Sequence, residues 1–327
     1  MTHSDWKPSA TFKQLQFRAE LYKNVRAYFA ALGVLEIETP LLINHPVIDS
    51  HIAPFKIADK QGRHRYLHTS PEYAMKRLLA AGSGSIYQIC KVFREEEEGK
   101  FHNPEFTMLE WYRVGIDYHE LMHEISDLLQ ACGIQAQPSY ISYQKIFEQH
   151  FKANPHTINT TGLATLCEQH IKCFKDISLT SHTEHLDLLF SYVIQPNLGI
   201  EHPIFVYDFP RQQCALAKTG PNITDGNNAY KQNNYTISQR FELFWKGIEL
   251  ANGYQELTDP VELQRRLTNE AQTRSLATSE IDPFLLQAQQ HGLPECAGVA
   301  VGLDRLLMSI QNFQDISEVI SFTTPRA

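Results

Sequence analysis

Two glutamates, Glu242 and Glu249, flank the dipeptide Lys246-Gly247. If that dipeptide forms the turn of a hairpin, Phe244 lies opposite Glu249 and Glu242 lies diagonally on the same face. The two carboxylates would then converge, and hard oxygen ligands on one face suit Mg²⁺ that arrives with nucleotide phosphates. The alternative is a solvated acidic strand.

A second polar pair follows directly. Asn252 and Glu256 share strand parity, and a bulge at Gly253 would turn both side chains inward. An amide and a carboxylate would then point the same way.

Residues 119–123 read His-Glu-Leu-Met-His, a pattern that on a helix can place two histidines on zinc. However, Leu121, Ile125, Leu128 and Leu129 form the apolar stripe of the same helix, so the two histidines lie on its other side. The sequence offers no third ligand with supporting context. We interpret the segment as the outer face of an amphipathic helix.

Three further segments follow one another along the chain, at 29–41, 93–112 and 298–306. The middle one reads Phe-Arg-Glu-Glu, then an acidic loop, then His-Asn-Pro-Glu-Phe-Thr-Met. Together they resemble the three signature motifs of class II aminoacyl-tRNA synthetases, most of all those of the lysyl branch. Three ordered motifs are hard to produce by chance. The resemblance implies an α+β catalytic fold, with an antiparallel β-sheet flanked by helices, that activates a carboxylate with ATP.

Lysyl-tRNA synthetases carry an anticodon-binding OB domain ahead of the catalytic core. Here the first motif begins by Phe17, and the few residues before it are too few for a five-stranded barrel. The chain thus resembles the truncated paralogues that ligate (R)-β-lysine onto a lysine of elongation factor P. This implies one catalytic domain over residues 1–327, with a small insertion at about 139–203, ATP and Mg²⁺ as cofactors, elongation factor P as acceptor, and a homodimer.

Formation of an aminoacyl-adenylate requires a carboxylate to attack the α-phosphate of ATP, so catalysis is positioning and charge neutralisation without a general base. The resemblance makes Arg94 the bridge between substrate carboxylate and α-phosphate, and Arg305 the partner of the γ-phosphate. Buried, ion-paired arginines are the alternative. It implies nucleotide contacts at Arg94, Glu96, His102, Asn103, Phe106, Glu249, Leu250, Gly302 and Arg305, with Mg²⁺ at Glu242 and Glu249. Phe106 would stack on adenine or, alternatively, belong to the core.

A diamino acid needs acidic partners at two ends. Glu72, Glu110 and Glu256 supply them, whereas a neutral amino acid would leave some of these carboxylates buried and unpaired. The resemblance pairs Glu256 and Tyr112 with the distal ammonium, Asn252 and Arg94 with the carboxylate, and Ser70 and Glu72 with the remaining amine.

The third motif departs from the lysyl pattern Gly-x-Gly-x-Gly-x-Asp-Arg, because Ala300 replaces the middle glycine. One methyl group would then line the substrate pocket. Our hypothesis is that it crowds the α-amino group of ordinary lysine and favours an amine on the β-carbon, by about 1–3 kcal/mol.

The composition favours a protein partner over a nucleic acid. With 327 residues and 43% hydrophobic content the chain can bury a full core, and its 37 acidic and 29 basic residues give a net charge of −8. That charge makes tRNA binding a poor fit and suits a basic protein. Six cysteines without a Cys-x2-Cys pair predict neither zinc nor disulfides, and no apolar run approaches the roughly 18 residues of a membrane span. We expect a soluble, cytoplasmic protein without a membrane partner.

Two other functions stay open. One is an enzyme that charges tRNA with α-lysine, with anticodon binding supplied in trans; Ala300 and the acidic balance disfavour it. The other is an inactive regulatory paralogue that binds an amino acid or partner without turnover. The presence of Arg94, Glu242, Glu249 and Arg305 disfavours that alternative.

The elements that must position these residues are partly readable. Apolar residues at three- and four-residue steps predict a helix over 17–32 that stops at Gly33, followed by an extended segment at 34–40. A helix at 71–81 and a strand at 86–93 place Glu72 and Arg94 at element ends. From Phe106 a strand puts Glu110 and Tyr112 on one face. Helical patches are expected at 162–173 and 184–192, and a polar loop at 217–235.

Overall fold

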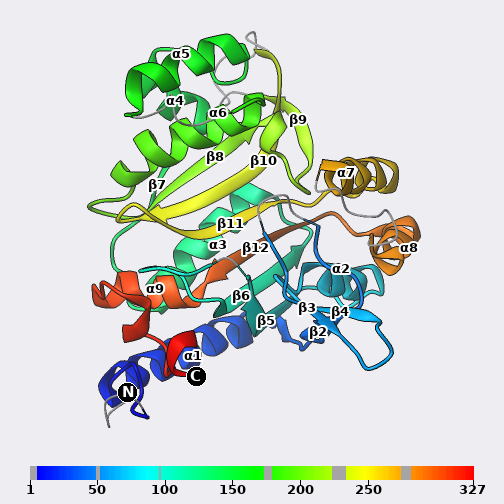
Figure 1. Ribbon diagram of the computed structural model, residues 1–327, viewed down its shortest axis with the longest axis vertical. Coiled ribbons are helices and arrows are strands. Elements are labelled where there is room, and N and C mark those ends of the chain that lie inside the picture. The colour runs from blue at the N-terminus through cyan, green and yellow to red at the C-terminus, as the bar shows by residue number, and fades with distance from the viewer. Residues whose placement is uncertain (1–5, 49–51, 96, 173–178, 223–232, 274–280) are drawn as a thin grey trace. The chain divides into compact units, whose positions relative to one another are not determined.

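The computed structural model describes residues 6–48, 52–95, 97–172, 179–222, 233–273 and 281–327 (Figure 1). The chain divides into two compact parts. The first part comprises residues 1–117, 123–135 and 258–327, and the second comprises 118–122 and 136–257. Whether they act as the single domain expected from the sequence stays a prediction.

The first part is built on a largely antiparallel sheet. Its strand β1 runs parallel to β5, whereas β5 with β6, and β6 with β12, are antiparallel pairs. The strands are β1 (Leu35–Glu36), β5 (Ile86–Phe93), β6 (Glu105–Val114) and β12 (Cys296–Gly302), and a small separate sheet holds β2 (Leu42–Ile43), β4 (His64–Leu67) and β3 (Lys56–Ala58). The helices are α1 (Phe12–Ala31), α2 (Glu72–Ala80), α7 (Pro260–Thr273), α8 (Pro283–Gly292) and α9 (Leu303–Gln311).

Local sequence explains why α1 forms and where it ends. Thr11 and Gln14 form a capping box at its start. Leu21, Val25 and Phe29 recur every four residues and are buried. Gly33 then adopts φ +66°, a conformation that favours glycine, and stops the helix. The predicted helix and its glycine stop are confirmed.

Strands β5 and β6 carry most of the predicted chemistry of the first part. The predicted strand at 86–93 matches β5, and α2 begins at Glu72 as expected. Along β6 the side chains alternate as the period of two requires: Glu110 and Tyr112 contact one another on one face, whereas the side chains of Thr107 and Trp111 contact other residues. The predicted facing of this strand is confirmed.

The second part packs helices on the strands β7 to β11. In it β7 is parallel to β8, and β10 is antiparallel to β8, β9 and β11. Side chains of α4, α5 and α6 share one apolar cluster with β8 and β10, and these helices lie beside the strands in Figure 1. Its elements are β7 (Ser139–Ser142), α4 (Tyr143–Phe151), α5 (Thr160–His170), α6 (His182–Leu189), β8 (Ile204–Pro210), β9 (Thr219–Asn222), β10 (Asn233–Trp245) and β11 (Ile248–Gln255).

Two expectations for this part need correction. The helical patches correspond to α5 and α6, but α4 and the strands β7 and β8 were not predicted. The segment 217–235 was expected to be a polar loop, yet β9 and the start of β10 lie in it and pair with one another. Backbone pairing decides the structure there despite the polar composition. Residues 223–232 lie outside the described residues.

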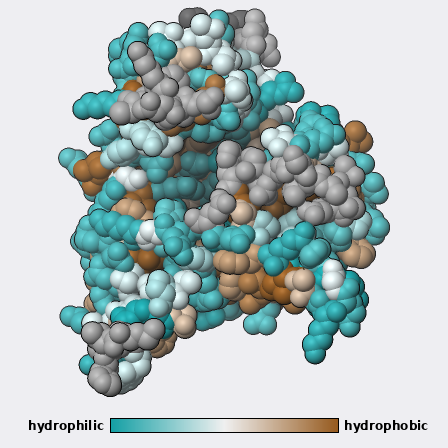
Figure 2. Space-filling model, viewed as in Figure 1, coloured by the Kyte–Doolittle hydropathy of each residue, from teal (hydrophilic) through white to brown (hydrophobic). Residues whose placement is uncertain are grey.

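Each part thus packs helices on a mainly antiparallel sheet, and the expected α+β class is confirmed. Figure 2 shows a surface that is mostly hydrophilic on the face in view, with smaller apolar areas. Among the described residues, no helix is both long and apolar enough to span a membrane.

Candidate active site

The centre of the candidate site in the first part is Glu110. Its side chain on β6 is buried, with 2% of the residue exposed. The Tyr112 hydroxyl donates to one carboxylate oxygen at 2.6 Å, and the Ser70 hydroxyl donates to the other at 2.8 Å. The structure therefore brings together three residues that the sequence assigned to the substrate.

Glu72 joins this group through Ser70 and has a partner of its own. Its backbone N–H donates to the Ser70 hydroxyl at 3.0 Å. One turn further along α2, the Lys76 ammonium lies 2.6 Å from the Glu72 carboxylate. Lys76 is a buried lysine, only 4% exposed, that the sequence analysis missed. A glutamate followed by a lysine four residues later on a helix was the available signal.

The electrostatic surroundings of Glu110 would suit an ammonium group. Burial raises the pKa of Glu110 to about 7, and the negative charge of Glu72 adds to the rise. The hydrogen bonds from Tyr112 and Ser70 and the charge of Lys76 act in the opposite direction on this pKa. Near neutral pH the carboxyl group is thus partly protonated, and a bound cation would favour its ionised form.

Ala300 lies on the same face of the sheet as this group. In the β6–β12 register Ala300 stands directly opposite Glu110, and Gly298 stands opposite Tyr112. Directly opposite residues have their Cβ atoms about 4.5–5.5 Å apart. The methyl group therefore neighbours the Glu110 side chain, as the sequence hypothesis requires. Its effect on substrate choice stays a prediction.

Arg94 and Arg305 both meet Glu97, which the sequence analysis placed in a solvated loop. An Nη of Arg94 donates to the Glu97 carboxylate at 2.8 Å, and an Nη of Arg305 lies 3.8 Å from the other oxygen. Nε2 of His102 is 3.7 Å from the same carboxylate. Burial acts to raise the pKa of Glu97, but the charges of Arg94, Arg305 and His102 lower it overall. One carboxylate therefore links the two arginines that were assigned to the ATP phosphates.

The remaining nucleotide candidates of the first part have these positions. The Arg94 guanidinium lies over the Phe106 ring, 5.0 Å from its centroid. Asn103 is buried, donates to the Glu105 carbonyl at 2.7 Å and accepts from the Thr324 N–H at 3.0 Å. Gly302 is the residue before α9, on which Arg305 lies. Glu96 lies outside the described residues.

A buried ion pair supports the second and third motifs. Arg18 of α1 donates to Asp304 at 2.5 Å and to the Thr107 hydroxyl at 2.6 Å. The other oxygen of Asp304 accepts the Thr107 N–H at 2.6 Å. Asp304 precedes Arg305 in the chain, so this network fixes the start of α9 against β6. Sequence reasoning did not identify Arg18 as a partner.

In the second part the predicted hairpin is confirmed. Lys246 and Gly247 have φ of 55° and 75°, as a two-residue type I′ turn requires, and Phe244 pairs with Glu249. The bulge, however, is at Leu250 and not at Gly253, because the register shifts between Phe244 and Leu243. This register shift places Asn252 directly opposite Glu242.

Arg240 links these two residues and was also missed. Its guanidinium donates to the Glu242 carboxylate, to the Asn252 side-chain oxygen at 3.2 Å, and to the Gln213 carbonyl at 2.8 Å. Burial raises the pKa of Glu242 to about 7; the Arg240 charge opposes this rise and the Glu249 charge adds to it. Glu242 and Glu249 are thus close enough to interact, and their oxygens fit a hard cation such as Mg²⁺.

The other candidates of this part are more deeply placed. Leu250 is 2% exposed, and Glu256 is fully buried just beyond the end of β11, where it forms a bridge with Ala217. Glu256 thus keeps a protected position suited to an ammonium group, whereas Leu250 contributes an apolar contact at most.

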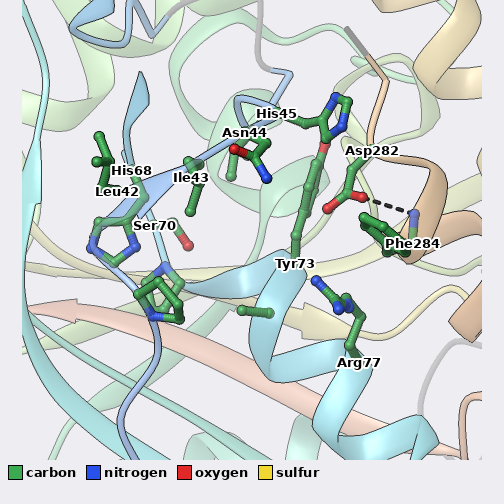
Figure 3. Close-up of a pocket in the computed structure, with 14 residues that line it drawn as sticks. Leu42, Ile43, Asn44, His45, His68, Ser70, Tyr73, Arg77, Asp282 and Phe284 are labelled. Atoms are coloured by element: carbon green, nitrogen blue, oxygen red, sulfur yellow. Dashed lines mark hydrogen bonds between the residues drawn. The ribbon is translucent and has the colours of Figure 1, made fainter. Parts of the chain in front are cut away.

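Ser70 also borders a cavity of about 260 Å³ in the first part (Figure 3). Arg77 lies over the Phe284 ring, 5.0 Å from its centroid, and Asp282 accepts the Phe284 N–H at 2.8 Å. The Tyr73 hydroxyl accepts the Ile48 N–H at 3.1 Å. The sequence analysis assigned none of these residues. The cavity therefore lies beside Ser70, whose hydroxyl donates to Glu110.

The zinc-like histidine pattern lies on helix α3 (Tyr118–Ala131). Leu121, Ile125, Leu128 and Leu129 are buried as predicted, and His119 and His123 are exposed. Within the described ranges, no group of three or more histidine, cysteine or acidic side chains is arranged to hold a metal ion.

Comparison with known proteins agrees with this arrangement. Residues 2–326 match the family of class II tRNA synthetases (D, K and N). The chain therefore belongs to the class II tRNA synthetases. It is 41% identical over 335 residues to the elongation factor P–(R)-β-lysine ligase of Enterobacter sp. (strain 638), covering 98% of each chain. The ligases of the same name from Edwardsiella ictaluri (strain 93-146) and Salmonella arizonae are 40% and 41% identical, covering 99% and 98% of each chain.

Proposed function

We propose that this chain is an ATP-dependent ligase that activates (R)-β-lysine and transfers it to the ε-amino group of a lysine of elongation factor P. The observation that carries the proposal is the identity of about 41% over 98% of both chains to relatives named for that activity. The buried carboxyl groups of Glu110 and Glu72 support it, because a substrate ammonium group would favour the ionised form of Glu110.

In the first step a carboxylate oxygen of β-lysine attacks the α-phosphorus of ATP. An acyl-phosphate bond forms, the bond to the β-phosphate breaks, and pyrophosphate leaves. We assign Arg94 to the attacking carboxylate and the α-phosphate, and Arg305 to the γ-phosphate. Glu97 has to release both arginines before they can bind phosphate. Glu242 and Glu249 would hold Mg²⁺, which neutralises phosphate charge when bound.

We assign Glu110 and Glu256 to ammonium groups of the substrate and Asn252 to its carboxylate. Ser70 and Tyr112 hold Glu110 by both oxygens, so its orientation is fixed before the substrate arrives. Such preorganisation lowers the cost of binding, since no side chain has to be ordered.

In the second step the neutral ε-amine of the acceptor lysine attacks the carbonyl carbon of the adenylate. An amide bond forms, AMP leaves with the bonding electrons, and one proton is released to solvent. We also propose that the ligase acts in the cytoplasm as a homodimer. The exposed Leu32 and Leu35 at the end of α1 and on β1 support an interface there.

The test is ATP–pyrophosphate exchange with (R)-β-lysine, (S)-β-lysine and α-lysine in parallel, followed by mass analysis of elongation factor P incubated with the best substrate. We expect exchange to be fastest with (R)-β-lysine and the factor to gain the mass of one β-lysyl group. Faster exchange with α-lysine and aminoacylation of tRNA would favour the tRNA-charging alternative. No exchange with any diamino acid would favour the inactive paralogue.

A further inference from the structure

We propose that Arg240 is a positioning residue that orients the Asn252 amide toward the substrate carboxylate. This inference rests on the proposed function, in which Asn252 binds that carboxylate. Arg240 lies on β10, two residues before Glu242, and neither Arg240 nor its bond to Asn252 was predicted from the sequence.

The chemistry of the Arg240 and Asn252 side chains determines how the amide is oriented. A guanidinium group has only N–H donors, whereas an asparagine amide has an oxygen on one side and an NH₂ group on the other. Nε of Arg240 is 3.2 Å from the Asn252 amide oxygen. The amide therefore turns its oxygen to Arg240 and its two N–H donors away. Those donors are what a carboxylate ligand requires.

Arg240 is itself held too firmly to follow Asn252. Its two Nη groups donate to the Glu242 carboxylate and, at 2.8 Å, to the Gln213 carbonyl. The face of the guanidinium lies over the Phe209 ring, 4.8 Å from its centroid. Only 18% of the Arg240 side chain is exposed. The orientation of the amide is therefore set before any ligand binds.

The bulge in β11 explains why Asn252 is within reach. If the register continued from Phe244–Glu249 without a bulge, Leu250 would pair with Leu243 and Ala251 would stand opposite Glu242. With the bulge, Asn252 stands opposite Glu242, on the face toward which Arg240 also points. The bulge and the arginine together thus deliver an oriented amide.

A lysine at this position would keep the charge but lose the planar set of donors that reaches three acceptors at once. Arg240→Lys should therefore leave Glu242 with a cation and leave the Asn252 amide able to rotate. We expect about tenfold weaker binding of a carboxylate ligand, the effect of one hydrogen bond to a charged group.

The experiment compares two ligands by calorimetry without ATP or Mg²⁺: (R)-β-lysine and the amino alcohol (R)-3,6-diaminohexan-1-ol, which replaces the carboxylate by CH₂OH. The preference of the intact protein for β-lysine should fall about tenfold in Arg240→Lys and equally in Asn252→Ala. The double variant should lose no more than Asn252→Ala alone, because the arginine acts through the amide. Arg113→Lys is the matched control: Nε of Arg113 donates to Glu124 at 2.7 Å, and the preference should be unchanged.

A full preference in Arg240→Lys, or additive losses in the double variant, would overturn the proposal. If Arg240→Lys does not fold, Arg240→Gln combined with Glu242→Gln removes the ion pair as a unit and leaves no buried charge alone. That pair of substitutions should lower the preference for β-lysine about tenfold, and retention of the full preference by the pair refutes the role of Arg240. If the intact protein binds neither ligand, it is the proposed function that fails.

Discussion

Glu97 is the residue whose removal makes the sharpest prediction, because it links the two arginines assigned to the ATP phosphates. Its carboxylate accepts from Arg94 at 2.8 Å and lies 3.8 Å from Arg305. If the two arginines bind phosphate as proposed, Glu97 occupies the place of phosphate oxygens. ATP has to replace this carboxylate, so we expect Glu97→Gln to bind ATP more tightly than the intact protein.

The structure sets the size of the effect. A hydrogen bond between charged groups contributes about 1.5–3 kcal/mol. The Arg94 and Glu97 side chains are 21% and 24% exposed, so solvent screens part of this energy. Glutamine also keeps an acceptor oxygen. We take about 1–1.4 kcal/mol as the loss of competition, which corresponds to a Kd for ATP about five- to tenfold lower. The longer contact with Arg305 adds little.

Calorimetric titration with ATP and Mg²⁺ in the absence of amino acid would measure this. Glu98→Gln is the matched control, since it removes the same charge from the neighbouring, exposed position and should leave the Kd unchanged. Adenosine, which has no phosphate, should bind both variants equally. An unchanged or higher Kd for ATP in Glu97→Gln would show that Glu97 does not compete with the phosphates, and the reasoning would be wrong.

Three further predictions concern the first part. Glu110→Gln should raise the KM for β-lysine about 10–100-fold in ATP–pyrophosphate exchange. The pKa of Glu110 is about 7, so a proton competes with the substrate ammonium, and the KM of the wild-type protein should fall as pH rises from 6 to 8. If Glu110→Gln keeps the same dependence of KM on pH, the assignment is wrong. Ala300→Gly should raise α-lysine activation relative to β-lysine by about 5–150-fold, and an unchanged ratio contradicts the hypothesis. Asp304→Asn should lower the free energy of unfolding in urea by about 3–5 kcal/mol, because it leaves the Arg18 charge buried, and an added Arg18→Met should restore part of it.

Sequence reasoning succeeded where a short segment determines its own structure. The α1 helix has its capping box, its apolar period and its glycine stop within the segment itself. The turn at Lys246-Gly247 needs positive φ at both residues, which the dipeptide tolerates at its glycine, and the pairing of Phe244 with Glu249 follows from it. Facing along β6 follows from the period of two alone.

The partners of the buried charges were not predictable in the same way. Arg18 and Asp304 are far apart in sequence, and neither carries a local signal for the other. The Arg240–Asn252 bond depends on a bulge at Leu250, which is an apolar residue with no composition signal for irregular backbone. The strands β7 and β8 pair in parallel although residues 143–203 separate them in sequence, so their pairing is likewise set by distant contacts.

Three of the candidate groups contain an ion pair between two side chains of the protein itself. Lys76 pairs with Glu72, Arg240 with Glu242, and Glu97 with Arg94. The first two counter-charges lie on the regular elements α2 and β10, where backbone hydrogen bonds and burial hold them in place. We therefore expect them to remain when a ligand binds.

Glu97 differs, because it belongs to no helix or strand and contacts the two arginines that the proposed function assigns to phosphate. A counter-charge that stays in place, such as Arg240, orients the side chain beside it. One that the ligand displaces, as we expect for Glu97, only occupies the binding group until the ligand binds. On this distinction, removal of Arg240 should weaken ligand binding, and removal of Glu97 should strengthen it. The signs are opposite because Arg240 orients a binding side chain, whereas Glu97 competes with the ligand for one.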